Sequence, residues 1–514
     1  MSLVVILALA ACFLGWLAVK SSNAAAAMKV PTVSICRCTP DFINRLLYVF
    51  MARRLIYKGY NKYKDTPYRV RKVDADLIVL PAKYLPYIRQ MDHTKISLLE
   101  AQYDSVCGDY THLLHDSNLP SHTVSRRLTP ALSRVVPKVI DELKHAFQIE
   151  VPECKDKYVP VNLYYMILYI VTRATSRIIV GDTVCRSQTW LDTVTKYTEN
   201  LGTALLLLRP LPPLLRPLIA SFLPQPRYLK KTMRWVKEGI FIPVILERRE
   251  KEAMDPDYQK PDDFIQWIMD GEDNESDADP GTIAQGVMII IALAVVHTSS
   301  MLITQGLFDL LLRPEYLKPL REEINDTLKE GWENATKQDF AKQIKLDSFL
   351  RESQRLNPTS EVNVQRIVKE TLIFPDGFTV PEGTHIVFPA GPLSRDPTLI
   401  TNPGTFDGLR WCPNSSNNDS DTDSDKAIES KNDSIVTASP LNLHFGYGRQ
   451  ACPGRHFASA TSKALLSKLL VEYDIKPLDS KQWKRPTNIR NGEQIMPNLF
   501  TKVLIRRREV PAGI

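Results

Sequence analysis

A short loop near the C-terminus, residues 445–455, constrains this chain more than any other stretch. It reads Phe-Gly-Tyr-Gly-Arg-Gln-Ala-Cys-Pro-Gly-Arg and precedes an apolar helical pattern over residues 456–473. Cys452 is therefore expected just before a helix N-terminus, where free N–H groups and the helix dipole favour a thiolate. Pro453 is predicted at the first helical position, where its missing N–H costs nothing.

The chemistry of this loop suits a metal-binding cysteinate. Gly446 and Gly448 permit backbone conformations closed to other residues and a close approach to a flat partner. Such a loop suits a thiolate ligand, above all for a haem iron. Alone, it fits a buried free cysteine in a turn equally well. The eight cysteines of the chain show no disulfide framework and no paired zinc pattern.

Two further motifs precede the cysteine loop in the chain. Glu352 and Arg355 are three residues apart on one predicted helix face, and Arg410 follows in the run 406–411. We expect Glu352 to lie between the two arginines and to join its helix to the loop beneath a haem. A long helix is predicted over residues 282–312, and Thr298 interrupts its apolar centre. That hydroxyl either passes protons or only bends the helix.

The N-terminal run 3–19 is uncharged and close to the minimum length of a membrane span. The basic residues follow this run, so the positive-inside rule places the N-terminus in the lumen and the rest in the cytosol. A signal peptide cleaved near residues 24–27 is the alternative. The sequence predicts an anchor (1–20), a linker (21–40) and one catalytic domain (41–514).

Helical patterns dominate the predicted domain, with a small β-rich part that includes a strand pair within residues 68–80 and strands within 363–388. The proline- and leucine-rich stretch 209–226 cannot be one long helix. It could line an access route or contact the membrane surface. Alternatively, it is an irregular buried connector. Residues 414–439 are rich in Ser, Asp and Asn and are expected to be a disordered insertion. The net charge of +7 is mild and argues against a nucleic-acid binder.

These motifs, in this order, resemble the cytochrome P450 family of haem-thiolate monooxygenases. The resemblance covers almost the whole chain after the anchor. Finer features are similar to the membrane-bound fungal branch that includes ent-kaurene oxidase and related terpenoid oxidases. They are Gly-Tyr-Asn-Lys-Tyr-Lys at 59–64, His-Thr-Ser at 297–299, and the stretches 346–355 and 445–455.

The resemblance implies a mainly α fold with a small β-rich subdomain after one transmembrane helix. It implies haem b, oxygen activation, and electrons from NADPH through a membrane-bound NADPH–cytochrome reductase. Cys452 is the implied axial ligand of the iron, tuned by the backbone N–H groups that follow it, and Thr298 the residue that assists proton delivery. The implied haem contacts come from the cysteine loop and from two more distant arginines: Phe445, Arg449, Gln450, Arg366 and Arg126.

Two positions depart from the family pattern. Gln450 stands where an Arg or His usually meets a propionate, so it offers a hydrogen bond without a charge. His297 stands where an acid is common, and histidine can relay protons near neutral pH. A cationic face for the reductase is expected from basic residues around the cysteine side: Arg126, Arg127, Arg134, Arg449, Arg455, Lys463 and Lys468.

The resulting hypothesis is a single-pass protein of the endoplasmic reticulum that hydroxylates or successively oxidises a lipophilic small molecule, a terpenoid by branch resemblance. One rival is an oxygen-independent haem-thiolate isomerase or dehydratase. The other is a non-enzymatic haem-binding membrane protein.

Overall fold

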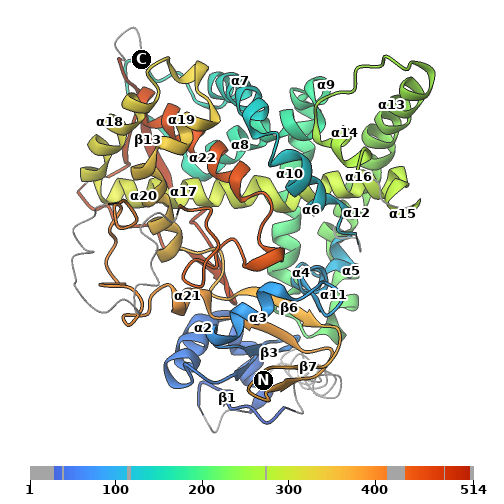
Figure 1. The fold of residues 1–514 in the computed structure, drawn as a ribbon. Coiled ribbons are helices and arrows are strands. Elements are labelled where there is room, and N and C mark those ends of the chain that lie inside the picture. The colour runs from blue at the N-terminus through green and yellow to red at the C-terminus, as the bar shows by residue number, and fades with distance from the viewer. Residues whose placement is uncertain are drawn as a thin grey trace.

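The computed structural model describes residues 28–36, 40–112, 117–271, 275–413, 434–479 and 481–509. Helices form most of the molecule, and the main sheet lies at one end of it, beside α2 and α3 (Figure 1). The predicted fold class, mainly α with a small β-rich part, is confirmed. The predicted anchor over residues 1–20 and the linker up to residue 27 lie outside the described residues.

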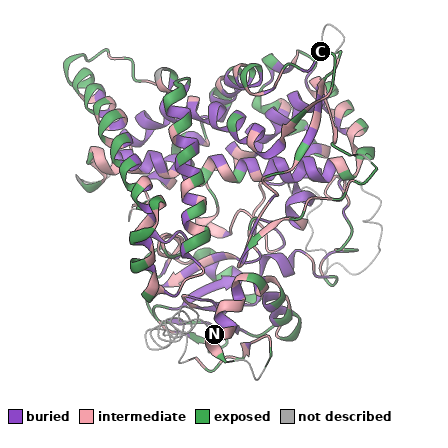
Figure 2. Cartoon of the chain, turned by 180° about the vertical axis from the view of Figure 1, so that it is seen from behind, coloured by how far each residue is buried: buried purple, intermediate pink, exposed green. Residues whose placement is uncertain are grey.

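One helix rod crosses the whole molecule (Figure 1). It comprises α16 (Pro280–Ile289), the π-helical stretch η6 (Ile290–Val295) and α17 (Val296–Leu312). By length and composition this rod and α8 (Leu163–Val180) could each cross a bilayer, but most of the apolar window of each is buried in protein. Figure 2 shows such buried residues along the interior helices and exposed residues on the outer ones.

The other helices pack around this rod or cover the sheet. Their bounds are α2 (Asp41–Lys62), α3 (Leu85–Gln90), α4 (Leu98–Ser105), α5 (Gly108–Thr111), α6 (Leu119–Thr123), α7 (Leu132–Glu150), α9 (Asp182–Cys185), α10 (Gln188–Leu208), α11 (Arg216–Phe222), α12 (Pro224–Val236), α13 (Ile242–Met254), α14 (Phe264–Met269), α15 (Glu275–Ala278), α18 (Leu317–Thr327), α19 (Lys337–Lys342), α20 (Ile344–Leu356), α21 (Ala390–Leu393) and α22 (Arg455–Glu472).

The main sheet has the strand order β1-β2-β3-β9-β6-β4. Its strands are β1 (Thr32–Val33), β2 (Tyr68–Arg71), β3 (Asp76–Val79), β4 (Ile96–Ser97), β6 (Asn363–Val368) and β9 (His385–Phe388). The predicted strand pair within 68–80 is present as antiparallel β2 and β3. The ladder between β6 and β9 is irregular between Asn363 and Arg366, and Val364 there has φ +52°. Such a conformation is rare for a β-branched residue.

Three smaller sheets complete the fold. β10 (Tyr473–Pro477), β13 (Lys502–Arg507) and β5 (Val159–Asn162) form the first, β11 (Ile489–Asn491) and β12 (Gln494–Met496) the second, and β7 (Leu372–Ile373) and β8 (Thr379–Val380) the third.

The predicted insertion needs a correction at its C-terminal end. Residues 414–433 lie outside the described part of the chain, whereas residues 434–439 are ordered against the core. Ile435 is fully buried, and its N–H donates to Asp347 of α20 at 2.6 Å. One apolar residue with a bonded amide is enough to hold this end of an otherwise polar segment.

Candidate functional site

The cysteine loop is closed by its own backbone. The N–H of Cys452 donates to the carbonyl of Phe445 at 2.7 Å, and Ala451 donates to Gly448 at 3.1 Å. Gly446 and Gly448 have φ of +77° and +70°, a region that L side chains rarely adopt. The two glycines therefore permit the turn that brings residue 452 back beneath residue 445.

Two details of the loop differ from expectation. A Cβ at position 448 would come within 2.6 Å of the Arg89 Cα, so the close approach at Gly448 is to the end of α3. Pro453 precedes the helix, because α22 begins at Arg455 with Gly454 as its N-cap. The chain thus makes one more turn after Cys452 before the helix starts.

The Cys452 side chain is solvent-exposed but closely surrounded by protein. Its side chain is exposed, yet enough protein surrounds it that desolvation raises the pKa of the thiol above its usual range. The N–H groups of Gly454 and Arg455 and the charge of Arg455 act in the opposite direction and favour the thiolate. The backbone N–H groups expected after the cysteine are thus directed at its sulfur.

The central rod presents one open face in the middle of the molecule. Ala294 and Thr298, one turn apart, are exposed, whereas Ser299 and Ser300 are buried. The Thr298 hydroxyl donates to the Ala294 carbonyl at 2.5 Å. Ala294 belongs to the π-helical stretch η6, and such stretches are frequent at functional sites. Thr298 lies on α17, which packs against α22, and Cys452 lies in the loop that leads into α22.

His297 points elsewhere. Its Nδ1 lies 2.8 Å from the Tyr164 hydroxyl of α8. Burial lowers the pKa of His297 to about 4, although a hydrogen bond to the Thr198 carbonyl opposes the shift. The ring is therefore neutral at pH 7. The expectation that it titrates near neutral pH is wrong, because no acidic partner compensates for its desolvation.

Glu352 is the centre of a buried network that includes both predicted arginines. Arg355 donates to its two oxygens at 2.8 and 2.7 Å, and Arg410 donates at 3.2 Å. The arginines also bind backbone carbonyls of residues 394–405. The network fastens α20 to the loop that contains Arg410.

The sequence reasoning missed several members of this framework. Trp411 donates its indole N–H to Glu352 at 3.2 Å, and the amide of Asp407 donates at 3.1 Å. Asp347, one helix turn and a residue before Glu352, pairs with Lys463 of α22 at 2.7 Å. Trp411 could have been predicted as a member of the network, because it is an aromatic residue directly after Arg410. The Asp347–Lys463 pair joins two helices far apart in sequence, and no sequence pattern indicates it.

Arg366 is an isolated buried cation. It lies on β6 and is 2% exposed, with Nη1 bonded to the neighbouring Gln365 carbonyl. Its Nε has no hydrogen-bond partner among the described residues. Burial lowers the pKa of this guanidinium to about 10. A buried guanidinium without a carboxylate partner fits the haem propionate that was predicted for it.

The remaining predicted haem contacts differ in their surroundings. Gln450 donates from Nε2 to the Ile96 carbonyl at 3.3 Å, so its donor joins the cysteine loop to β4. Phe445 is partly buried and packs against the main core. Arg449 and Arg126 are exposed. Arg126 lies on η3 (Val124–Leu128), which is followed by a threonine whose hydroxyl donates to the Pro453 carbonyl.

The predicted cationic face is smaller than expected. Lys463 and Lys468 are both buried, and they form ion pairs with Asp347 and Glu472, respectively. Both side chains belong to α22, which is enclosed on most sides, so its lysines bind inward carboxylates. Arg134 is exposed but pairs with Asp262 at 3.0 Å.

The donor set around Cys452 fits a haem. Among the described residues there is no group of three or more His, Cys, Asp or Glu side chains that could hold a metal ion. A metal at Cys452 must therefore bring its other ligands with it, as a haem iron does. The exposed Cys452 sulfur could supply the iron ligand. Arg366, which has no carboxylate partner among the described residues, could bind a propionate.

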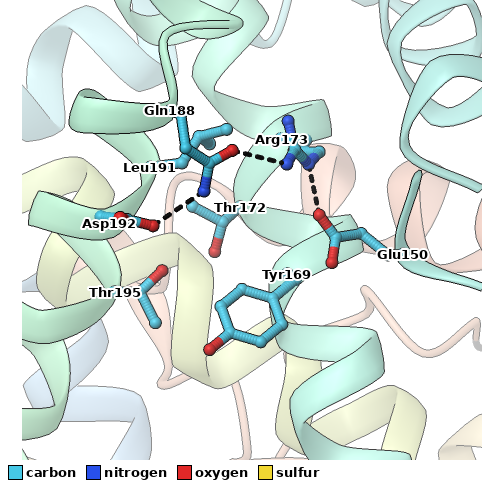
Figure 3. Close-up of a pocket in the computed structure, with 8 residues that line it drawn as sticks. All are labelled: Glu150, Tyr169, Thr172, Arg173, Gln188, Leu191, Asp192 and Thr195. Atoms are coloured by element: carbon cyan, nitrogen blue, oxygen red, sulfur yellow. Dashed lines mark hydrogen bonds and ion pairs between the residues drawn. The ribbon is translucent and has the colours of Figure 1, made fainter.

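A distinct cavity of about 170 Å³ lies between α7, α8 and α10 and includes no predicted site residue (Figure 3). Arg173 bonds there to Glu150 at 2.6 Å and to Gln188 at 3.3 Å. Arg173, Glu150 and Gln188 therefore bond to one another, whereas the Thr195 hydroxyl of the same lining has no hydrogen-bond partner among the described residues.

Known proteins share this sequence over most of its length. The family model "Cytochrome P450" matches residues 118–499. Cytochrome P450 monooxygenase AtmP of Aspergillus flavus is 40% identical over 509 residues, which is 99% of this chain and 95% of the relative. PaxP of Penicillium paxilli is 40% identical over 94% of this chain and 92% of its own. PenP of Penicillium crustosum is 41% identical over 94% of this chain and 90% of its own. The chain therefore belongs to the cytochrome P450 family of haem-thiolate monooxygenases.

Proposed function

We propose that this cytochrome P450 oxidises an unactivated carbon of a lipophilic small molecule at a haem bound through Cys452. Haem b with a cysteine thiolate ligand, supplied with electrons from NADPH through a reductase, is the cofactor of the family and activates dioxygen when bound. One observation carries the assignment to these residues. A solvent-exposed cysteine lies in the loop that leads into α22, and a solvent-exposed threonine lies on α17, the buried helix that packs against α22.

Each residue then has a defined task. The Gly454 and Arg455 N–H groups hold negative charge on the Cys452 sulfur. Arg366 binds a propionate, and Gln450 keeps the cysteine loop at β4. Thr298 donates to a carbonyl in the resting helix and retains lone pairs on an exposed oxygen. It can therefore accept a hydrogen bond from water and pass a proton by rotating its hydroxyl.

The substrate class follows from the surroundings and from the relatives. Leu293 and Val295 flank the exposed Ala294 and are partly exposed, so this part of the central rod is apolar. The similar proteins are fungal monooxygenases. Both observations support a terpenoid of fungal secondary metabolism, hydroxylated once or oxidised in successive rounds.

A membrane location is supported by one segment of the sequence and by one described surface. The apolar run 3–19 is proposed as the single-pass anchor in the endoplasmic reticulum. A second, described surface carries exposed apolar side chains on α10, η4 (Pro213–Leu215) and α11, namely Leu206, Leu207, Leu214, Leu218 and Phe222. Deleting residues 3–19 should release much of the protein from membranes. Complete retention would make the second surface the principal contact.

The test of the site uses microsomes that contain the protein, its reductase and NADPH. Cys452→Ala should abolish the spectrum of the thiolate-ligated carbonyl haem, while Cys412→Ala should retain it. A surviving spectrum in Cys452→Ala would show that another residue is the ligand. With a terpene panel, an NADPH-dependent product supports monooxygenation. An isomerised product without NADPH would support the isomerase instead, and no product from any lipophilic substrate would favour a non-enzymatic haem protein.

A further inference from the structure

The cavity between α7, α8 and α10 has a buried floor and an exposed rim (Figure 3). Thr172, Leu191 and Thr195 are buried, and Thr195 is only 3% exposed. Gln188 and Asp192 are exposed. The volume of about 170 Å³ corresponds to about five or six molecules of liquid water, so the cavity can hold water or a small solute.

A chain of side-chain hydrogen bonds along the cavity wall joins two carboxylates (Figure 3). The Arg173 guanidinium donates from Nε to Oε1 of Glu150 at 2.6 Å and from Nη2 to the Gln188 amide oxygen at 3.3 Å. The Gln188 amide nitrogen donates to Oδ1 of Asp192 at 2.8 Å. Each carboxylate uses one oxygen in this chain. The other oxygens, Oε2 of Glu150 and Oδ2 of Asp192, accept no hydrogen bond from the described residues.

The lining has a net negative charge. Arg173 is the single cation among the described lining residues, and the same lining contains two carboxylates, Glu150 and Asp192. Asp192 forms no ion pair with a described residue, because its one bond comes from a neutral amide. Burial raises the pKa of the Tyr169 phenol, and the negative charges of Glu199, Glu150 and Asp192 raise it further. The cavity thus has one negative charge more than its own cation offsets.

Thr195 adds a buried hydroxyl that the protein leaves unpaired. Its Oγ1 makes no hydrogen bond within the described part of the chain, and Figure 3 shows this oxygen directed toward the other lining side chains. The Thr172 hydroxyl, by contrast, donates to the Leu168 carbonyl at 2.7 Å. A buried polar atom without a partner is costly, and a hydroxyl oxygen can accept a hydrogen bond as well as donate one. An N–H group of a ligand directed at Thr195 would satisfy this atom.

We propose that this cavity binds a small primary ammonium ion with a short apolar tail. The single positive charge offsets the excess negative charge of the lining. The three N–H donors of the ammonium group have acceptors in Asp192, Glu150 and Thr195, and charged hydrogen bonds of this kind are strong. Tyr169 supplies an aromatic ring, which attracts cations. The site is separate from the haem site, since none of its lining residues belongs to the cysteine loop or to the central rod.

The test is isothermal titration calorimetry of the full-length, haem-loaded protein in detergent, with imidazole at saturation so that the iron accepts no amine. Butylammonium should bind once per chain. Butan-1-ol is neutral and tetramethylammonium has no N–H donor, although both match butylammonium in their number of non-hydrogen atoms. Each should bind more weakly by about tenfold or more. Because imidazole occupies the iron, the result does not depend on the proposed function of the haem site.

Two variants locate the bound amine. Asp192→Asn removes the uncompensated charge at an exposed position, and Thr195→Val removes the hydroxyl while keeping the size of the side chain. Each should weaken butylammonium binding by about tenfold. Thr195→Val should keep or raise the melting temperature of the free protein, because the hydroxyl that it removes has no partner among the described residues. Asp141→Asn changes an exposed carboxylate of α7 outside the cavity and should bind butylammonium as the wild type does.

Three results would overturn the proposal. One is the absence of saturable butylammonium binding at millimolar concentrations. Another is tetramethylammonium binding as tight as that of butylammonium, which would indicate a general attraction of cations to a negative surface. The third is unchanged butylammonium binding in both Asp192→Asn and Thr195→Val, which would place the amine elsewhere on the protein.

Discussion

The molecule contains two buried charge clusters that differ in how completely they are bonded. Glu352 accepts from Arg355, Arg410, Trp411 and a backbone amide, and its arginines bind carbonyls with their other N–H groups. In the second cluster the Glu493 side chain accepts one charged hydrogen bond, from Arg209, and also interacts with the buried Tyr48 hydroxyl. Both clusters are buried, and they differ in the number of donors that surround the carboxylate.

The largest expected difference between the two clusters is in stability. Glu352→Gln leaves two buried arginines without their carboxylate and should cost about 3–5 kcal/mol. Glu493→Gln leaves one buried arginine, Arg209, without its carboxylate and should cost less, about 1.5–3 kcal/mol. Urea unfolding followed by tryptophan fluorescence measures both. Equal losses would remove the energetic distinction between the two clusters.

A smaller effect is expected where only one donor of the Glu352 network is removed. Trp411→Phe deletes the indole N–H but keeps an aromatic ring beneath Arg351, whose guanidinium lies 3.8 Å from the ring centroid. The loss of a hydrogen bond to a charged group should cost about 1.5–3 kcal/mol. Trp235→Phe, at an exposed position, is the control. A Trp411→Phe protein as stable as the control would show that the indole bond adds nothing.

The cluster around Glu493 should lose stability in acid because of a buried histidine beside it. Burial lowers the pKa of His385 to about 4, below its unfolded value near 6.5. Between these values the unfolded chain binds more protons, so folding stability falls as the pH falls. The loss from pH 7.5 to pH 5 should be about 2 kcal/mol for this residue. His385→Gln should show a correspondingly weaker pH dependence in the same unfolding measurement, and an identical pH dependence would contradict this account.

The smallest expected effect concerns the link from the cysteine loop to the sheet. Gln450→Ala removes one hydrogen bond, to the Ile96 carbonyl, and should cost about 0.5–1.5 kcal/mol. Haem loss to apomyoglobin should become faster, because the loop loses its side-chain bond to β4. Unchanged haem loss would mean that the closed backbone turn is sufficient.

Local motifs were predictable from sequence, and long-range pairings were not. Glu352 and Arg355 share one helix turn, so their contact follows from helix geometry. The partners in Arg209–Glu493 are 284 residues apart, and those in Arg216–Asp74 are 142 apart. No local pattern encodes such contacts. The proline- and leucine-rich stretch 209–226 is not one long helix, as predicted, and its division into η4, α11 and the start of α12 was not predicted. The partners of its arginines depended on the tertiary fold.

Charge on the cysteine side shows a second limit of sequence reasoning. Lys463 and Lys468 were expected at the surface because lysine is rarely buried without a partner. Both have partners, Asp347 and Glu472, and α22 is enclosed by other helices. The exposed cations that remain near the loop are Arg126, Arg127 and Arg449. Whether a lysine is solvated depends on which carboxylates the fold brings to it.

The π-helical stretch Ile290–Val295 gives the central rod two rotational phases. A π-helical turn contains one more residue than an α-helical turn, and each α-helical residue advances the helix by about 100°. The faces of α16 and α17 are therefore offset, so Thr298 need not share a side with the residues that one uninterrupted helix would align with it. A single-residue deletion within 290–295 would return the two halves to one phase. The open face would then rotate into the core, although every side chain of the cysteine loop was unchanged.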